Sequence, residues 1–511
     1  MALEKEPTFT KWRQRLWPVQ RHEHKKIIPL FILKFLFTIN FYLLGFATKD
    51  TLVVTASNSG AEVIPILKGW IVLPCSIFML LVYTKMSNKL SQEKLFYAVL
   101  AGFLGFFLLF GFVLYPLRDI LSPTGLCDWL QAALGDTRTH WVAVIRHWMN
   151  SVFYVMAELW GTMVLVLLFW TFANNINRVG EAKRFYTLFV AAGNLAPVIG
   201  GLIICSICPS DPSVNFETAM RKITLLSSVV IILAMGIYWW MQRYVITDDQ
   251  LCPLDIQNEV KKKKPKLSLK DSIKYILSSR YLLCISLLVI GYAFAFNLIE
   301  VTWKASMKLQ FPTASSYQHF MGKVTFILGV TTPPVAFLLS GNLIRKLGWY
   351  RSACIVPIII GLTGILFLAA YLFRDQISPI ATLFSVSPLY FVVILGMLQN
   401  VTTKTLKFSV FDPTKEMAFI PLDSEAKIKG KAAIDVVGSR LGKAGSSWTQ
   451  VLLIEFFGMG SVLGITHIIL PVVVLIVAVW LVSLRSLNRS FTALTTQKEE
   501  ELPPASVAEE A

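Results

Sequence analysis

Ionisable side chains lie within or beside four long apolar segments of this chain, where they are costly. The C-terminal segment is the most charged, because four polar residues recur in it at intervals of four. On a helix this spacing forms one polar stripe, made of Lys431, Asp435, Ser439 and Lys443. Arg440 precedes Lys443 by three residues, and nearby glycines permit the close approach of another helix or of a ligand. Ionisable groups carried to membrane depth mark the path of a substrate or an ion by default.

Lys49 and Asp50 follow the apolar run 28–47, and apolar residues resume after them. We therefore expect the first helix to be longer than its strictly apolar part, with Gly45 as a weak point where it can bend. Lys49 would then point into a helical bundle.

Glu158 stands alone in the apolar run 151–172, with no cation three or four residues away. It must pair with another helix, be protonated or face water. Asn194, in the run AAGNLAPVIGG, is a weaker polar candidate.

In the C-terminal half, spacings of three and four place Asn297, Glu300 and Lys304 on one helical face, where the last two can form an ion pair.

Each candidate also has a purely structural alternative. Lys49 would then belong to a charged loop, Glu158 would be a protonated core residue, and Asn194 would hydrogen-bond between helices. Glu300 and Lys304 would form an interfacial pair at the outer end of their helix. The C-terminal stripe would belong to a cytoplasmic amphipathic helix.

The functional alternative is a cationic cavity that binds a polyanion. Lysine and arginine bind phosphate oxygens by charge-assisted hydrogen bonds, and carboxylates would pair with them in the absence of the anion. The cations are Lys49, Lys304, Arg440 and Lys443, and the carboxylates are Glu158, Glu300 and Asp435.

These residues require membrane helices to position them. Only 15% of the 511 residues are charged and the mean hydropathy is +0.60, which excludes a large soluble domain. Apolar runs long enough to span a bilayer recur along the chain. They predict an all-α polytopic membrane protein with about twelve helices: 27–47, 66–84, 95–115, 151–173, 185–207, 223–241, 281–301, 324–343, 353–373, 380–399, 432–457 and 463–484.

We attribute the net charge of +17 to the orientation of the chain in the membrane rather than to nucleic-acid binding. Lysine and arginine gather in the N-terminal arm and in alternate loops, which by the positive-inside rule places both termini in the cytoplasm. The acidic residues of the arm argue against a signal or transit peptide, so we expect insertion into a bacterial inner membrane, in contact with lipid.

The chain divides around a polar, basic linker into two six-helix bundles of the major-facilitator type. We expect short helices in the outer loop 116–148. The predicted parts are a cytoplasmic basic arm (1–26), an N-terminal bundle (27–241), a cytoplasmic linker (242–280), a C-terminal bundle (281–484) and a disordered cytoplasmic tail (485–511). Cysteines and histidines are too scattered to predict a metal site or cofactor, and we expect a monomer with no enzymatic activity.

Four segments closely resemble the ATP:ADP antiporter family of plastids and obligate intracellular bacteria. They are KDTLVVTASNSGAEVIPILKGWIVLP (49–74), AELWGTMVLVLLFWTFANNI with EAKRFYTLF (157–189), NLIEVTWK (297–304) and the glycine- and charge-rich stretch 411–447. The arm LWPVQRHEHKKIIPLF resembles chlamydial members. The resemblance implies that Lys49, Glu158, Glu300 and Lys443 carry nucleotide binding and exchange, and that Arg440 bears on substrate choice. For the base of a nucleotide, we expect an aromatic neighbour such as Tyr154 or Trp160.

The sequence just before Lys49 departs from the family, because the polar pair that many ATP/ADP exchangers have there is absent. We expect a transporter of ATP and ADP, or of other nucleoside di- and triphosphates, that works by alternating access as an antiporter. The alternatives are a proton-coupled nucleoside triphosphate symporter of the same family and, in another class, a major-facilitator organic-anion exporter.

Overall fold

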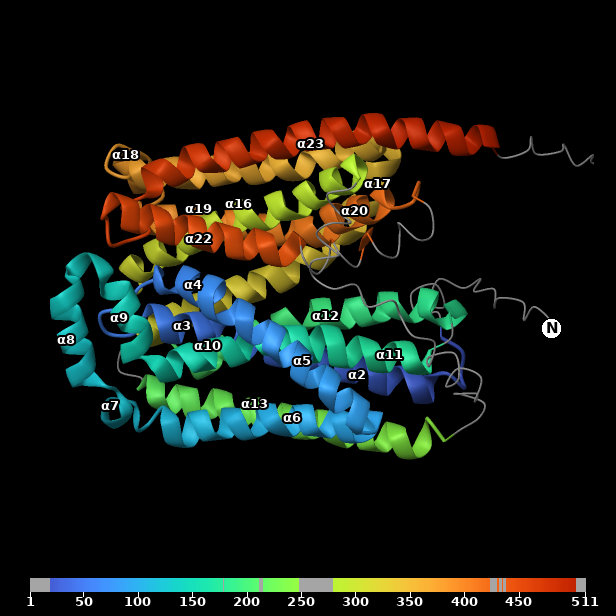
Figure 1. The fold of residues 1–511 in the computed structure, drawn as a ribbon, viewed down its shortest axis with the longest axis horizontal. Coiled ribbons are helices and arrows are strands. Elements are labelled where there is room, and N and C mark those ends of the chain that lie inside the picture. Colours follow the sequence, from blue (N-terminus) through green and yellow to red (C-terminus); the bar gives the residue numbers. More distant parts are fainter. Residues whose placement is uncertain are drawn as a thin grey trace, which may run out of the picture. The chain divides into compact units, whose positions relative to one another are not determined.

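The computed structural model describes residues 19–177, 179–210, 215–247, 279–422, 430, 431, 434 and 438–501. All regular structure in these ranges is helical, and eleven helices are long and apolar enough to cross a membrane. The predicted all-α polytopic membrane fold is confirmed. Figure 1 shows the helices running in bundles, with the chain coloured from blue to red.

The chain divides into two compact units, which we describe separately. The first holds Met1–Lys264 together with Met307–Pro333, and the second holds Pro265–Ser306 together with Pro334–Ala511. The segment 307–333 belongs to the first unit because its helix packs closely on an earlier one. A side chain at Gly201 would place its Cβ 2.5 Å from the Phe326 amide nitrogen. The bundle and tail boundaries predicted from the sequence remain predictions.

Six membrane-spanning helices of the first unit come from its N-terminal part, and four of them contain π-helical turns. The first span joins α2 (His24–Asn40), η1 (Phe41–Thr48) and α3 (Lys49–Val54). The others are α4 (Val63–Ile66) with η2 (Leu67–Val72) and α5 (Leu73–Lys89), α6 (Gln92–Leu109) with η3 (Phe110–Leu114), α10 (Trp148–Trp160) with η5 (Gly161–Leu168) and α11 (Phe169–Ile176), α12 (Val179–Ile207), and α13 (Phe216–Tyr244).

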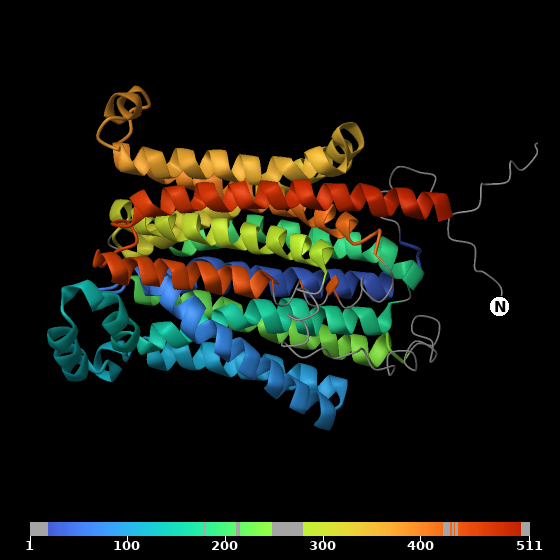
Figure 2. The same cartoon turned by 45° about the horizontal axis from the view of Figure 1, so that its top comes forward.

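The segment 116–148, which we expected to be an outer loop with short helices, does contain short helices. They are α7 (Arg118–Leu121), α8 (Thr124–Leu134), the 3₁₀ turn η4 (Asp136–Arg138) and α9 (Thr139–Arg146). Figures 1 and 2 both show them gathered at one end of the first unit. Arg146 pairs with Asp128 at 2.6 Å, which ties α9 to α8.

The second unit is built on α16 (Arg280–Gln310) and α17 (Ala314–Leu372), whose last and first parts respectively belong to the first unit. Two membrane-spanning helices, Ala314–Leu339 and Leu343–Leu372, lie within α17. Gly348, near the start of the second, has a φ of 77°, a left-handed conformation that suits glycine, and it kinks α17. The chain continues through α18 (Ser378–Leu383), α19 (Pro388–Leu406), η6 (Lys407–Phe411), α20 (Asp412–Ala418), α22 (Ser439–Phe457) and α23 (Thr466–Glu501).

The tenth helix does not lie where the sequence predicted it. We expected 380–399, but α19 begins at Pro388, and the membrane-spanning helix runs on to Ala418. Ser387 caps it by accepting a hydrogen bond from the Tyr390 amide at 3.2 Å, and proline suits the first helical position. Lys404, which follows the predicted end of this helix, therefore lies inside it.

The last two helices also differ from expectation. We predicted an eleventh helix over 432–457, and the described part, α22, begins at Ser439 and is not among the eleven apolar spans. We predicted the twelfth helix over 463–484, and α23 continues as far as Glu501, into the segment for which we expected a disordered tail.

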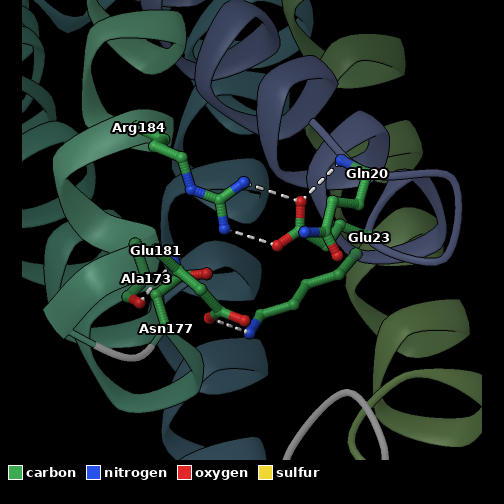
Figure 3. Close-up of polar contacts among 7 residues, drawn as sticks. Gln20, Glu23, Ala173, Asn177, Glu181 and Arg184 are labelled. Atoms are coloured by element: carbon green, nitrogen blue, oxygen red, sulfur yellow. Dashed lines mark hydrogen bonds and ion pairs between the residues drawn. The ribbon is translucent and has the colours of Figure 1, made fainter. Parts of the chain in front are cut away.

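Two ion pairs fix the start of the first helix against α12 (Figure 3). Arg184 donates two hydrogen bonds to the carboxylate of Glu23, at 2.6 and 3.0 Å, and the Gln20 amide donates a third at 2.7 Å. Lys26, whose side chain is 1% exposed, pairs with Glu181 at 2.7 Å. The two contacts cross from α2 to α12 and hold these helices together within the first unit.

Replacing Arg184 with methionine should destabilise the protein by about 2 kcal/mol, because it leaves the buried Glu23 carboxylate without its cation. Arg184 is 19% exposed, so the loss falls below that of a fully buried pair. Burial raises the pKa of Glu23, but the hydrogen bonds from Arg184 and Gln20 and the charge of Arg184 outweigh it, and the net pKa is lowered from 4.5. Since the folded pKa is depressed, this stabilisation is present above pH 4.5 and is lost as the pH falls through the folded pKa.

Thermal unfolding of the purified protein in detergent, measured between pH 4 and pH 8, checks this expectation. The difference between wild type and Arg184→Met should be full at neutral pH and shrink at the acid end. A difference that does not depend on pH would contradict the role of Glu23.

Candidate substrate-binding site

Lys49 and Glu158 come together inside the first unit. Lys49 Nζ lies 3.1 Å from Glu158 Oε1 and 3.0 Å from Asp50 Oδ1, and it stands 4.3 Å from the centre of the Tyr154 ring. The side chain of Lys49 is 5% exposed, whereas that of Glu158 is 25% exposed. Lys49 therefore lies within the first helix rather than in a loop, and Glu158 pairs with another helix.

Gly45, within the π-helical segment η1, allows the first and fourth helices to approach closely. A side chain at Gly45 would place its Cβ 3.0 Å from the Ala157 carbonyl oxygen and 3.1 Å from the Phe41 ring. Glycine at this position therefore brings α3 and α10 within ion-pair distance. Single π-helical turns inside α-helices are frequent at functional sites.

Gln318 fixes the turn that carries Lys49. Its amide nitrogen donates to Thr48 Oγ1 at 2.8 Å, and its amide oxygen accepts a hydrogen bond from Thr51. Thr48 in turn donates to the Leu43 carbonyl at 2.6 Å, within η1. Asn150 of α10 donates to the Leu52 carbonyl at 3.0 Å. The sequence pattern had not identified Gln318, because it lies outside every predicted apolar run.

A second charged cluster lies in the second unit around Glu300. Its Oε1 is 3.4 Å from Lys304 Nζ and 3.5 Å from Lys404 Nζ. The side chains of Glu300 and Lys304 are 10% and 2% exposed, so the pair expected from the four-residue spacing forms and is buried. Lys404 Nζ also stands 5.5 Å from the centre of the Phe296 ring.

Lys404 is the site residue that the sequence reading missed. We predicted that the tenth helix ends at residue 399, so Lys404 lay outside every predicted helix. The signal that could have revealed it is the Ser387–Pro388 start, which moves the whole helix toward the C-terminus.

Asn297 joins α16 to α22. Its Nδ2 donates to Ser446 Oγ at 2.8 Å and to Ser447 Oγ at 3.3 Å. A side chain at Gly442 would place its Cβ 2.7 Å from Ala293 Cβ and 3.0 Å from the Ile290 carbonyl oxygen. Glycine in α22 therefore permits the close approach of another helix, as expected. These contacts make Asn297 a residue that positions α22 against α16.

The remaining candidates do not join either cluster. Lys443 is exposed near the start of α22, whereas the predicted helix 432–457 would place it near the middle. Arg440 is half-buried, and no carboxylate in the described residues pairs with it. Asn194 is half-buried in α12. Lys431 is exposed and pairs with Glu416 at 2.5 Å, and Asp435 lies outside the described residues, so the polar stripe remains a prediction.

The aromatic residues that we expected to hold a base are occupied otherwise. Trp160 is 0% exposed and donates its indole hydrogen to the Phe37 carbonyl at 3.0 Å. Tyr154 is also 0% exposed, with Lys49 over its ring. Both are core residues of the first unit.

The ion pairs described in the two clusters differ. In the first unit Lys49 contacts two carboxylates, those of Asp50 and Glu158. In the second unit Glu300 contacts two lysines, Lys304 and Lys404. The second cluster therefore brings two ammonium groups close together, a grouping that suits the binding of an anion.

Gly442→Ala should destabilise the protein by about 1–3 kcal/mol, because the added methyl group overpacks the contact between α22 and α16. Gly236→Ala in α13 is the matched control, since its Cβ would meet nothing within 4 Å and alanine favours a helix. Thermal unfolding in detergent should show a lowered midpoint for the first variant and an equal or higher midpoint for the second. Equal midpoints for Gly442→Ala and wild type would contradict this packing.

Comparison with solved structures supports the fold. The chain is similar to a bacterial homologue of the iron transporter ferroportin in its inward-facing state, with a TM-score of 0.53 over 91% of this chain and all of that one, at 14% identity. This similarity agrees with the major-facilitator-like fold predicted from the sequence.

Comparison with sequences identifies the family. Residues 3–491 match the family model described as TLC ATP/ADP transporter. The chain is 43% identical to ADP,ATP carrier protein 1 of Chlamydia pneumoniae over 98% of both chains. It is 41% identical to the chloroplastic ADP,ATP carrier protein 1 of Arabidopsis thaliana, over 93% of this chain and 76% of that one, and 37% identical to ADP,ATP carrier protein 1 of Rickettsia prowazekii, over 96% and 97%. Whole-length matches of this kind show that the chain belongs to the TLC ATP/ADP transporter family.

Proposed function

We propose that this protein exchanges ATP for ADP across a membrane by alternating access, as an antiporter. Its family and the names of its relatives, which are ADP,ATP carriers, support this assignment. The observation that carries it is a pair of lysines, Lys304 and Lys404, that share one carboxylate inside a membrane helix bundle.

The geometry around Glu300 favours replacement of the carboxylate by phosphate. The two N···O distances of 3.4 and 3.5 Å exceed the 2.7–2.9 Å of a good charge-assisted hydrogen bond. A phosphate group offers three oxygens and a larger negative charge, so it competes well for both ammonium groups. Glu300 would then hold the two lysines in place until the nucleotide arrives.

Lys49 would also take part in nucleotide binding, within the first unit. Asp50 and Glu158 restrain it at 3.0 and 3.1 Å. Glu158 is the more exposed of its partners, and we propose that it separates from Lys49 when phosphate binds. Lys443, exposed at the start of α22, and Arg440 would meet the substrate on its way.

The chain is a multi-pass membrane protein, and we propose that it resides in the inner membrane of an obligate intracellular bacterium with both termini in the cytoplasm. We propose that it acts as a monomer and requires no cofactor. Without a bound nucleotide, the buried charges of the site would lack a counter-ion. Because moving such charges through the membrane is costly, the empty carrier would reorient slowly, and transport would require exchange of one nucleotide for another.

Uptake into proteoliposomes tests the function. Labelled ATP should enter vesicles preloaded with ADP and hardly enter vesicles without internal nucleotide, and Lys49→Gln should abolish this uptake. A proton-coupled symporter would instead work without internal nucleotide and fail with a protonophore. An organic-anion exporter would show no competition by excess unlabelled ATP, and either result would refute ATP/ADP exchange.

Lys404→Gln should raise the KM for ATP about tenfold, because one charge-assisted contact to phosphate is lost, worth about 1.4 kcal/mol. Lys407→Gln is the matched control. It lies in the same membrane-spanning helix, but its side chain is 34% exposed and pairs with Asp412 at 2.8 Å. Initial rates of exchange across a range of ATP concentrations measure both. An unchanged KM for Lys404→Gln in folded protein would exclude Lys404 from the site.

A further inference from the structure

Lys34 is a cation inside the first membrane helix that neither cluster uses. It lies in α2, and its Nζ stands 4.9 Å from the centre of the Phe169 ring and 5.4 Å from that of Trp170. Its side chain is half-buried, and no carboxylate in the described residues lies within ion-pair distance of it. Its surroundings in the described protein are therefore aromatic rather than anionic.

Helices α11 and α12 of the first unit pack around Lys34 of α2. Phe169 and Trp170 begin α11, and Trp170 packs edge-on against Tyr186 of α12 with ring centres 5.0 Å apart. Trp170 and Tyr186 are both half-buried, and the Tyr186 hydroxyl donates to Asn174 Oδ1. A side chain at Gly193 of α12 would meet Lys34 Cε only at 3.8 Å, so α12 leaves room beside the lysine stem.

Lys34 is too far from Lys49 to serve the same phosphate groups. The two lysines are about four helical turns apart on one continuous helix, roughly 22 Å at 1.5 Å per residue. A triphosphate chain is too short to contact both lysines. Any anion held by Lys34 therefore occupies a different site.

Aromatic faces attract an ammonium group but leave its charge in place. Cation–π contacts contribute about 0.5–2 kcal/mol, which is less than the cost of a charge within the membrane. An anion beside Lys34 would supply the missing compensation, and the half-buried edge of Trp170 and Tyr186 would cover the ligand's less polar part.

We propose that Lys34, Trp170 and Tyr186 form a second anion site that binds a phosphate group. Two sources have this chemistry: a nucleotide that pauses on its way to Lys49, and the headgroup of an anionic lipid. The nucleotide source rests on the proposed transport of ATP, whereas the lipid source does not.

The test uses the full-length protein and its Lys34→Gln variant, reconstituted in vesicles of phosphatidylcholine alone or with one fifth phosphatidylglycerol. Lys34→Arg keeps the charge and should restore wild-type behaviour. Lys89→Gln, an exposed lysine at the end of α5, makes the same charge change elsewhere. The readouts are the KM and maximal rate of ATP exchange, and the thermal unfolding midpoint in both lipids without nucleotide.

A nucleotide source predicts that Lys34→Gln raises the KM for ATP three- to tenfold in phosphatidylcholine, with the maximal rate nearly unchanged. A lipid source predicts that phosphatidylglycerol raises the unfolding midpoint of wild type and not that of Lys34→Gln, with the KM unchanged in phosphatidylcholine. The unfolding readout stands even if the protein transports no ATP. If Lys34→Gln matches wild type and Lys89→Gln in every readout, the site does not exist.

Discussion

The cost of an ionised side chain in a membrane helix governs the arrangement of this protein's site. The structure meets that cost at both clusters by joining their lysines to a carboxylate of the same unit. Lys49 of the first span pairs with Glu158 of the fourth, and Lys404 of the tenth pairs with Glu300 of the seventh. The first and fourth spans, and likewise the seventh and tenth, thus carry an ion pair, with the cation on the earlier helix in one pair and on the later helix in the other.

This pairing imposes requirements on the backbone. The first and fourth helices of the first unit approach closely only because Gly45 lacks a side chain where Ala157 passes. The π-helical segments η1 and η5 adjoin these two contact points, and η6 follows Lys404 by a few residues. A π-helical turn shifts the helical register, so it changes which residues beyond it face the bundle. The local irregularity and the charged residues therefore belong to one arrangement.

The sequence alone was sufficient to predict the helices and the strongest candidates, because hydropathy over about 20 residues and isolated charges are local signals. It predicted that Lys49 belongs to a long first helix, that Glu158 needs a partner, and that Glu300 pairs with Lys304. It could not choose the partner of Glu158, since no pattern records which helices meet. It missed Lys404 because an apolar run around residue 380 resembled the start of a helix, while the serine–proline cap lay several residues later.

The ion pairs described in the two clusters differ in length, and this difference bears on exchange. Lys49 contacts two carboxylates at 3.0 and 3.1 Å, so a phosphate must displace an acid to bind there. Glu300 contacts two lysines at the longer distances of 3.4 and 3.5 Å, so its hold on each ammonium group is weaker. An anion therefore displaces Glu300 from Lys304 and Lys404 more easily than it displaces Glu158 from Lys49, and Lys49 can accept a phosphate only after Glu158 has moved.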